Sequence, residues 1–355
     1  MGEQQTHKTQ LKLAIVIPCY NYATFVTHAI QSVTQQMREE CELVVVDDGS
    51  TDASWEAIQK TGVNAFRKEN GGALAACIYG FDKTTAPFVL FLDADDELRP
   101  GAIEHILSLL DDNVSKLQLS MPRIDADGNV ISEVNPLLSD FRVRESLQDQ
   151  VLKTGVYVSP PTSGNVFRRD ICEFLKEIDY DNCVDGAILF AAPFWGDVVS
   201  SSKPVVNYRI HSNNMSGLGR QLDPSIFQRD MDRYIGRMDH LRKLIKRSGS
   251  KAHLVDPRKT FYYRELKICH DVMTGKRPPL KDGLGVISSV SNKYFPIKQR
   301  VFFSLFHCLL TLAPNSVARN LVNYRFVSGG RSLGGFLKLV VGSLSQNKRK
   351  PQVTN

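Results

Sequence analysis

The sequence predicts an α/β fold, with a mixed and mostly parallel sheet flanked by helices, followed by a mainly helical and basic appendage. Over the first hundred residues, short apolar runs alternate with segments of helical periodicity, which is typical of parallel strands joined by crossover helices. The charge also divides along the chain of 355 residues. Residues 1–217 hold 18 Lys/Arg and 30 Asp/Glu, whereas residues 218–355 hold 26 and 8. We therefore expect an acidic α/β part and a separate basic part.

The α/β part is expected to begin with four strands and four helices in alternation. Apolar runs of four to six residues predict buried parallel strands, and apolar residues at a spacing of three and four predict the helices. The predicted strands are 13–18, 43–46, 63–67 and 88–92, and the predicted helices are 25–33, 52–60, 72–83 and 100–110.

The order is harder to predict after residue 111. We expect strands at 117–124, 155–158 and 205–210, so the sheet is predicted to be mixed. Asp127-Gly128 indicates a hairpin leading into Val130-Ile131. Residues 135–153 are expected to form an irregular, partly helical excursion.

Beyond residue 217 the pattern becomes helical. Asp223-Pro224 and Asp256-Pro257 each offer an N-cap followed by proline at the first helical position, and Gly249 and Gly275 end the two helices. Residues 301–313 are nearly all apolar but fall short of the roughly 20 residues that span a bilayer. This segment is either a core helix or a helix that lies in the membrane interface. Residues 332–343 are a weaker case of the same kind.

Composition limits the cellular setting and the partners. The seven cysteines contain no Cys-x-x-Cys pair, which indicates free thiols in a reducing compartment. Residues 1–12 are polar and lack an apolar signal core, so we expect a cytoplasmic protein. The basic part predicts an anionic partner such as a membrane surface or a phosphorylated lipid. It contains no recognisable nucleic-acid module, so no nucleic-acid partner is expected.

Three of the predicted strands end in polar or acidic residues. The segments are Ile17-Pro18-Cys19-Tyr20-Asn21, Val46-Asp47-Asp48-Gly49-Ser50 and Leu92-Asp93-Ala94-Asp95-Asp96. In α/β sheets, ligands bind just beyond the carboxyl ends of the strands. Adjacent carboxylates suit the hard divalent cations that bridge phosphates. The sequence therefore predicts a phosphate-bearing ligand at this edge of the sheet.

These segments resemble glycosyltransferase family 2. The resemblance covers roughly residues 11–217 and includes, further on, Val184-Asp185-Gly186 and Tyr208-Arg209-Ile210-His211-Ser212-Asn213-Asn214-Met215-Ser216. It implies a GT-A nucleotide-sugar fold and a catalytic domain over residues 1–217, followed by a helical basic region over 218–345 and a disordered tail over 346–355. It also implies transfer of a sugar, with inversion, from a nucleotide diphospho-sugar to a hydroxyl of a glycan or lipid-linked acceptor.

The resemblance assigns most of these residues to the donor, which is commonly UDP-linked. Tyr20 would pack against the base, unless it is a core tyrosine, and Asp48 would accept a hydrogen bond from the base, unless the turn only caps a helix. Asp93 would bind the ribose or reach the metal through water. The other implied donor contacts are Pro18, Asn21, Asn70, Gly72, Ala94 and Arg209, although Arg209 could serve the structure instead.

The resemblance also implies Mg²⁺ or Mn²⁺ bridging the diphosphate. Asp95 is the expected direct ligand, and His211 would complete the metal shell or contact the diphosphate. Asp96 would cap the next segment or coordinate. The metal would neutralise charge on the leaving nucleoside diphosphate.

Asp185 is implied as the general base that takes a proton from the acceptor hydroxyl. Asp185 could instead be a helix N-cap, and Asp179 and Asp181 are nearby rivals. Ser163-Gly164-Asn165 could form part of the acceptor wall.

One departure from the family pattern concerns the diphosphate. Family members often carry an arginine where this chain has Cys77. Either the metal and His211 suffice, or Arg67 or Lys68 substitutes, or the donor differs. This departure keeps a second hypothesis open, a catalytically inactive nucleotide-sugar-binding subunit. A nucleotidyltransferase is disfavoured, because residues 18–30 contain no Lys or Arg for a basic phosphate loop.

Under the leading hypothesis, the basic appendage holds the enzyme against the anionic inner face of the cytoplasmic membrane. Each Lys or Arg near such a leaflet contributes about 1 kcal/mol. The alternative is a helical bundle with solvated basic faces.

Overall fold

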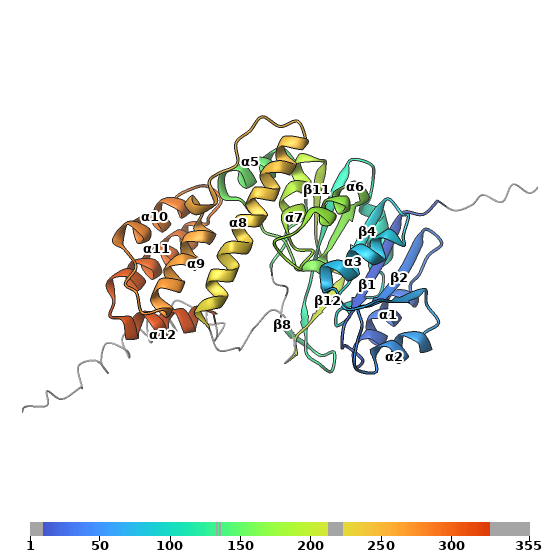
Figure 1. Cartoon of the computed structure of the whole chain (residues 1–355). Coiled ribbons are helices and arrows are strands. Elements are labelled where there is room, and N and C mark those ends of the chain that lie inside the picture. The colour runs from blue at the N-terminus through green and yellow to red at the C-terminus, as the bar shows by residue number, and fades with distance from the viewer. Residues whose placement is uncertain (1–9, 133, 135, 212–222, 327–355) are drawn as a thin grey trace, which may run out of the picture. The chain divides into compact units, whose positions relative to one another are not determined.

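The computed structural model of the chain describes residues 10–132, 134, 136–211 and 223–326 (Figure 1). They fall into two compact units. Unit 1 takes in the described residues of Met1–Val151, Val156–Ser212 and His240–Ala252, and unit 2 those of Leu152–Gly155, Asn213–Asp239 and His253–Asn355. The expected boundary at residue 217, the segment 332–343, the tail 346–355 and the motif residues 212–216 lie outside the described residues.

Unit 1 contains two sheets. In chain order the strands are β1 (Leu13–Cys19), β2 (Cys41–Asp47), β3 (Ala65–Arg67), β4 (Phe88–Phe91), β5 (Glu97–Leu98), β6 (Val114–Ser120), β7 (Arg123–Ile124), β8 (Val130–Ser132), β9 (Phe141–Val143), β10 (Asn165–Arg168), β11 (Asp197–Pro204) and β12 (Val206–Arg209). Within the described part of the chain, the larger sheet has eight strands in the order β3-β2-β1-β4-β10-β6-β11-β9, and the smaller has the order β5-β12-β7-β8.

The larger sheet is mixed, as expected. Strands β3, β2, β1 and β4 run parallel, and β6 runs parallel to β11. Strand β10 is antiparallel to both β4 and β6, and β9 is antiparallel to β11. The parallel half places the carboxyl ends of β1, β2 and β4 at one edge, which is where the predicted site residues begin.

Helices cover both faces of the parallel half. The α-helices that precede residue 200 are α1 (Val26–Thr34), α2 (Ser54–Lys60), α3 (Ala73–Asp82), α4 (Ala102–Leu109), α5 (Glu145–Thr154), α6 (Arg169–Cys172) and α7 (Ala187–Ala191). Three 3-10 turns accompany them, η1 (Thr162–Gly164), η2 (Glu173–Glu177) and η3 (Ala192–Phe194).

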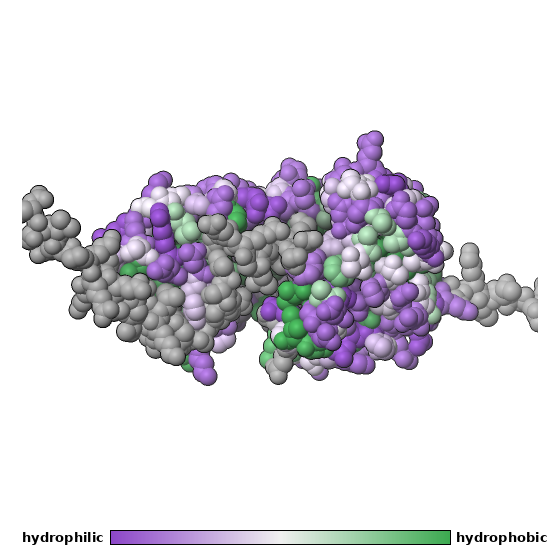
Figure 2. Space-filling view, turned by 90° about the horizontal axis from the view of Figure 1, so that it is seen from below, coloured by the Kyte–Doolittle hydropathy of each residue, from purple (hydrophilic) through white to green (hydrophobic). Residues whose placement is uncertain are grey.

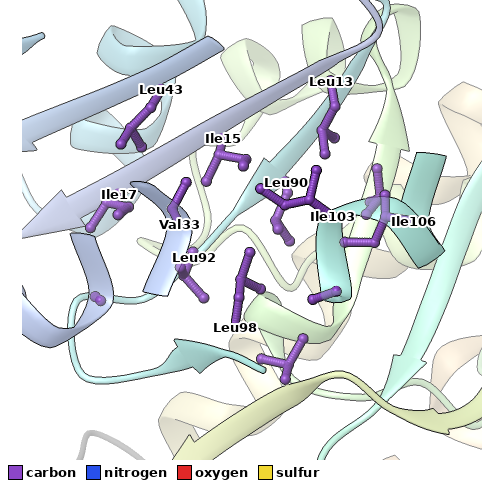
Figure 3. Packing of buried hydrophobic residues seen from close by; sticks show 14 of the residues in the cluster. Leu13, Ile15, Ile17, Val33, Leu43, Leu90, Leu92, Leu98, Ile103 and Ile106 are labelled. Carbon is purple, nitrogen blue, oxygen red and sulfur yellow. The ribbon is translucent and has the colours of Figure 1, made fainter. Parts of the chain in front are cut away.

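The core follows the alternation of side chains along each strand. Leu13, Ile15 and Ile17 of β1 are buried together with Val33 of α1 and Ile103 of α4 (Figure 3). On β2, Val44 and Val46 point to the opposite face, where they pack with Ala76 of α3. Gly80 of α3 permits this close packing, because a Cβ there would lie 2.4 Å from Val16. The strand ends are therefore anchored from both sides.

Unit 2 is helical. It includes the first part of α8 (Pro224–Arg247), whose last turns from His240 belong to unit 1, and then η4 (Pro257–Lys259), α9 (Phe261–Met273), α10 (Leu280–Val290), α11 (Ile297–Leu312) and α12 (Asn315–Phe326). Asp223 caps α8 by accepting from the Ser225 amide at 2.9 Å, as predicted. Phe306 and Leu310 of α11 are buried in the core of this unit. None of the described helices combines the length and apolar character needed to cross a bilayer.

Three expectations for the strands are wrong in detail. Residues 155–158 form no strand, because Gly155 adopts a φ of 79° and Pro160-Pro161 soon follow without N–H donors. The strand expected at 117–124 divides at Met121-Pro122 into β6 and β7, which belong to different sheets. Strands β5, β9, β10 and β11 were not expected, and β9 lies within the excursion predicted over residues 135–153.

One face of the described residues is shown in Figure 2. In the view of Figure 2, hydrophilic residues cover most of the described face and hydrophobic ones form smaller patches. Ordinary soluble surfaces share this appearance, so exposed apolar residues carry information only where they form a pattern.

Candidate active site

The loops after β1 and β2 are joined by a polar side chain. Asn21, at φ 59°, accepts hydrogen bonds from the Thr51 amide at 2.8 Å and the Asp52 amide at 3.3 Å, and its own amide donates to Ser50 Oγ at 3.0 Å. Asn21 therefore fixes the strand ends to each other. Tyr20 stands next to it, 44% exposed, with a ring face available to a ligand.

Asp48 is buried and accepts hydrogen bonds from three protein donors. Lys68 Nζ lies 2.6 Å from Oδ1, and the amides of Gly71 and Gly72 donate to its oxygens at 3.0 and 2.7 Å. Gly72 begins α3, so Asp48 connects β2 to the start of that helix. Its neighbour Asp47 pairs with Arg67 at 3.0 Å. Arg67 and Lys68, the two cations that could have replaced the arginine expected at position 77, are thus each paired with a carboxylate at the end of β2.

Three carboxylates gather at the end of β4. Asp93, Asp95 and Asp96 each offer an oxygen, and these oxygens lie within 4.8 Å of one another. Ser163 of η1 supports the loop by accepting from the Asp93 amide at 3.0 Å. Asp95 and Asp96 are buried and Asp93 is half-buried. Like charges in a buried place repel, so this cluster needs either protons or a cation.

The electrostatics of the cluster agree with its geometry. Burial, followed by the negative charges of Asp95 and Asp185, raises the pKa of Asp93 to about 8. Burial and the charges of Asp95 and Asp93 raise the pKa of Asp96 well above its usual range. Burial and the charges of Asp95, Asp93 and Asp96 raise the pKa of the Tyr22 hydroxyl.

His211 lies beside the cluster. Its Nε2 lies 3.0 Å from Asp95 Oδ2. The ring is held between Phe25 and Tyr22, with centroids 4.7 and 5.7 Å away. The sequence did not reveal these two aromatic neighbours, although Phe25 is the N-cap of α1 and Tyr22 lies in the loop before it.

Arg209 is a buried clamp. It donates to the Asp95 carbonyl at 2.9 Å and to the carbonyls of Asp125 and Ala126 at 3.1 and 3.0 Å, and it pairs with Glu97. The backbone amide of Arg209 donates to Asp96 Oδ1 at 2.9 Å. Of the two roles left open for Arg209, the contacts favour the structural one, which holds the acidic loop against β12.

Asp185 comes from a loop that docks onto the start of α3. The Leu74 amide donates to the Asn182 carbonyl at 3.0 Å, and the Ala187 amide donates to Tyr180 Oη at 3.3 Å. The charge of Asp185 raises the pKa of Asp93 and of Cys77, so Asp185 acts electrostatically on the acidic cluster. Asp179 and Asp181 are the rivals named above. Neither is among the charged groups that raise the pKa of Asp93, Asp96 or Cys77.

Comparison with known proteins identifies the family of the first half of the chain. Residues 14–175 match the family model described as glycosyl transferase family 2. An uncharacterized glycosyltransferase of Nostoc sp. strain PCC 7120 is 33% identical over 215 residues, covering 58% of this chain and 66% of the relative. The chain contains a glycosyltransferase family 2 domain.

Other relatives match a smaller share of their length. A teichoic acid poly(glycerol phosphate) polymerase of Staphylococcus epidermidis is 33% identical over 104 residues, which is 27% of this chain and 14% of the polymerase. The chain spans 66% of the Nostoc relative and 19% of the Rickettsia bellii glycosyltransferase that it also matches. Among solved structures, S. aureus TarS 1–349 in complex with UDP-GlcNAc has a TM-score of 0.52 at 16% identity, covering 89% of this chain and 92% of that one. This likeness shows the GT-A fold.

Cys77 stands where the resemblance to the family led us to expect arginine. It is buried on α3, and burial together with the charges of Asp93, Cys183 and Asp185 raises the pKa of its thiol well above the usual value. The thiol is therefore neutral and contributes no positive charge toward a diphosphate. Because Arg67 and Lys68 are paired with Asp47 and Asp48, two of the three alternatives stay open, a bound cation with His211 or a different donor.

The acidic cluster fits a divalent cation. Carboxylate oxygens and an imidazole nitrogen are suitable ligands for Mn²⁺, and carboxylates alone suit Mg²⁺. Asp96 Oδ2 is buried and accepts no hydrogen bond from the described residues, so it is an oxygen that a cation could satisfy. Asp93, Asp95 and Asp96 are the residues whose oxygens lie close enough together to hold one cation, and His211 lies beside Asp95.

Proposed function

We propose that this chain is an inverting glycosyltransferase that moves a sugar from a UDP-linked donor to an acceptor hydroxyl with the help of Mn²⁺ or Mg²⁺. The observation that carries the proposal is the acidic cluster at the end of β4, with His211 beside Asp95 and the charge of Asp185 acting on Asp93. A family 2 domain around this cluster supports the reaction class.

Each part of the site has a role in this proposal. A cation held by Asp95 and His211 would neutralise the charge of the leaving diphosphate. Tyr20 would pack on the base, and Asp48 would contribute its one remaining acceptor position to a base N–H. The other donor-side residues, Pro18, Asn21, Asn70, Gly72 and Ala94, would shape the loops around the nucleotide. Asp93 would contact the ribose or a metal-bound water.

Asp185 would act as the general base. It would accept the proton of the acceptor hydroxyl while that oxygen attacks the anomeric carbon from the face opposite the diphosphate. This displacement inverts the anomeric configuration. The charge of Asp185 acts on Asp93 from a loop separate from the metal loop, which supports the division of roles between the two acids.

The comparisons support a donor and an acceptor class. TarS binds UDP-GlcNAc, and one curated relative is a teichoic acid polymerase. We therefore favour hexosyl or N-acetylhexosaminyl transfer onto a glycan or lipid-linked acceptor used in a cell-envelope polymer.

The helical unit would supply contact with an anionic membrane. Ile297, Val301, Leu305 and Leu312 of α11 are each more than half exposed, and they recur on one side of that helix. Leu280 and Leu284 are similarly exposed on α10. Residues 283–355 contain ten Lys/Arg and no Asp or Glu. An apolar helix face in a segment without acidic residues is typical of helices that lie in the headgroup region of anionic leaflets.

Donor release tests the enzymatic proposal. Nucleoside diphosphate would be measured after incubation with a panel of nucleotide-sugars, with Mn²⁺, with Mg²⁺ and with chelator. We expect slow, metal-dependent hydrolysis of a UDP-sugar by the wild type. Asp185→Asn should bind the same donor but lose acceptor-stimulated turnover by about 10²-fold or more.

The same assay separates the alternative. Metal-dependent nucleotide binding without turnover of any donor would favour the inactive binding subunit. Neither binding nor turnover would contradict both hypotheses.

Vesicle binding tests the membrane contact. We expect co-sedimentation with phosphatidylcholine vesicles that contain phosphatidylglycerol, weaker at high salt, and little with pure phosphatidylcholine. A triple variant, Ile297→Ser, Val301→Ser and Leu305→Ser, should lose most of the binding. The matched control is Val130→Ser with Ile131→Ser, two exposed apolar residues of unit 1. Equal binding by both variants would contradict the assignment to α11.

A further inference from the structure

Lys116 is a buried cation inside the main sheet of unit 1. It lies on β6 between β10 and β11, with 0% of its surface exposed. Its Nζ contacts Ser159 Oγ at 2.8 Å, Tyr157 Oη at 3.2 Å and Gln118 Oε1 at 3.3 Å, and it lies 4.8 Å from the centroid of the Tyr157 ring. Within the described part of the chain, no carboxylate lies within ion-pair distance of this ammonium.

A lysine at this place is costly for a merely structural position. Burying an ammonium without a counter-ion carries a large desolvation penalty, and an apolar side chain would fill a central strand at lower cost. Burial lowers the pKa of Lys116 to about 7, and the negative charge of Asp185 acts in the opposite direction. Asp185 is thus the acid that stabilises the charged lysine, although the two do not form a direct pair.

One chain of contacts connects Lys116 to the loop of Asp185. Tyr157, which contacts Lys116 Nζ, donates its hydroxyl to the Leu189 carbonyl at 2.5 Å. Leu189 belongs to α7, the helix that begins directly after Asp185-Gly186. Lys116 therefore helps, through Tyr157, to hold α7 and with it Asp185, which directly precedes that helix.

A second chain of contacts leads from Lys116 to the acidic cluster. Ser159 donates to Asn165 Oδ1 at 3.1 Å, and Asn165 Nδ2 donates to the carbonyls of Pro160 and Pro161 at 3.0 and 2.9 Å. These prolines lead into η1, where Ser163 accepts from the Asp93 amide. Hydrogen bonds thus connect Lys116 both to the helix that follows Asp185 and to the loop that contains Asp93.

We propose that Lys116 is a positioning residue for the transfer reaction, which holds the loop of Asp185 and the metal loop in place through Tyr157 and Ser159. The inference rests on the proposed function, in which Asp185 is the base. Lys116 is enclosed, so it acts through the position of these loops and does not touch the substrates.

The test compares Lys116→Met with the wild type in the donor-release assay across pH 5 to 9. Methionine keeps roughly the length and volume of the side chain and removes the charge together with the hydrogen bonds to Tyr157, Ser159 and Gln118. We expect kcat to fall about tenfold at every pH, because the loop of Asp185 is no longer held against the metal loop. The KM for the donor should change less than twofold.

Two further variants complete the experiment. Lys203→Met removes an exposed lysine from neighbouring β11 and should leave the profile unchanged. Tyr157→Phe breaks the contact between the lysine and α7 but leaves the charge, so kcat should again fall at every pH. If Lys116→Met does not fold, Tyr157→Phe decides, and an unchanged kcat in that variant overturns the proposal.

The outcomes distinguish this inference from the function on which it rests. A wild type that turns over no donor, or an Asp185→Asn variant as active as the wild type, overturns the proposed function and the inference with it. An inactive Asp185→Asn beside a Lys116→Met variant with the wild-type kcat and pH profile overturns the inference alone.

Discussion

The ends of β2 and β4 both carry neighbouring acids, but the fold treats the two groups in opposite ways. After β2, Asp47 pairs with Arg67, and Asp48 is surrounded by Lys68 and two backbone amides. After β4, the neighbours of Asp93 and Asp96 include further carboxylates, whose charges raise the pKa of both groups. The first group is paired with Arg67 and Lys68, although Asp47 Oδ1 accepts no hydrogen bond from the described residues. The acids of the second group mainly face one another, apart from His211 beside Asp95 and the Arg209 amide on Asp96.

This difference shows how a site can be recognised from energetics as well as from motifs. Carboxylates that find their own cations stabilise the native state, whereas carboxylates crowded together destabilise it until something positive arrives. Residues that cost stability without a ligand are expected at functional positions. We therefore interpret Asp47 and Asp48 as holding the loops and Asp93, Asp95 and Asp96 as awaiting a cation.

The largest expected effect concerns activity. Asp95→Ala removes the carboxylate that adjoins His211, so metal-dependent donor turnover should fall about 10³-fold. Thermal unfolding of the metal-free variant should occur at the same temperature as wild type or higher, because one of the repelling charges is gone. An active Asp95→Ala variant would show that the cation binds elsewhere.

The next effect concerns stability and contrasts the two groups directly. Lys68→Met leaves Asp48 without its cation and should lower the free energy of unfolding by about 2 kcal/mol. Asp93→Asn in the absence of metal should leave it unchanged or raise it. Urea denaturation monitored by circular dichroism measures both, and loss of stability in Asp93→Asn equal to that in Lys68→Met would remove the contrast.

The smallest effect is a dependence on pH. The folded chain keeps the proton of Asp93 up to about pH 8, whereas the unfolded chain releases it near the ordinary value of 3.8. Between these values the unfolded state binds fewer protons, so the metal-free protein should become less stable as pH rises from about 4 to 8 and then level off. Asp96 acts in the same direction.

Unfolding at several pH values, with and without Mn²⁺, measures this dependence. Asp93→Asn should flatten the metal-free curve, and saturating Mn²⁺ should flatten the wild-type curve in the same range. A wild-type curve that rises from pH 5 to 8 in the absence of metal would contradict the assignment of raised pKa values to the cluster.

The donor side of the site could be predicted from local sequence because its residues follow directly on apolar strands. Asp93, Asp95 and His211 come together as the motifs imply, and the parallel strands β1, β2 and β4 lie where the apolar runs are. The roles of Asp48 and Arg209 were harder to predict, because motif position does not show which protein donors or acceptors a side chain meets. Lys68, Gly71 and Gly72 surround Asp48 only through the fold.

The acceptor side could not be predicted to the same extent. Strand β10 lies between β4 and β6 and pairs antiparallel with both. Both partners are distant from β10 in the sequence, and no local periodicity predicts the strand. Lys116 sits in a segment, Val114–Ser120, whose alternation of polar and apolar residues is typical of a half-exposed strand, yet every residue of it is buried. Burial of polar side chains depends on partners such as Tyr157 and Ser159, which only the folded chain brings near.

Binding of Mn²⁺, measured by isothermal titration calorimetry in the presence and absence of UDP, tests most directly whether the cluster after β4 is the site that awaits a cation. Wild type and Lys68→Met would be compared with Asp95→Ala at one pH near 8. We predict one Mn²⁺ per chain for the first two, bound more tightly when UDP is present, and loss of binding in Asp95→Ala. Equal Mn²⁺ affinity in wild type and Asp95→Ala, or no binding by the wild type even with UDP, would contradict the account.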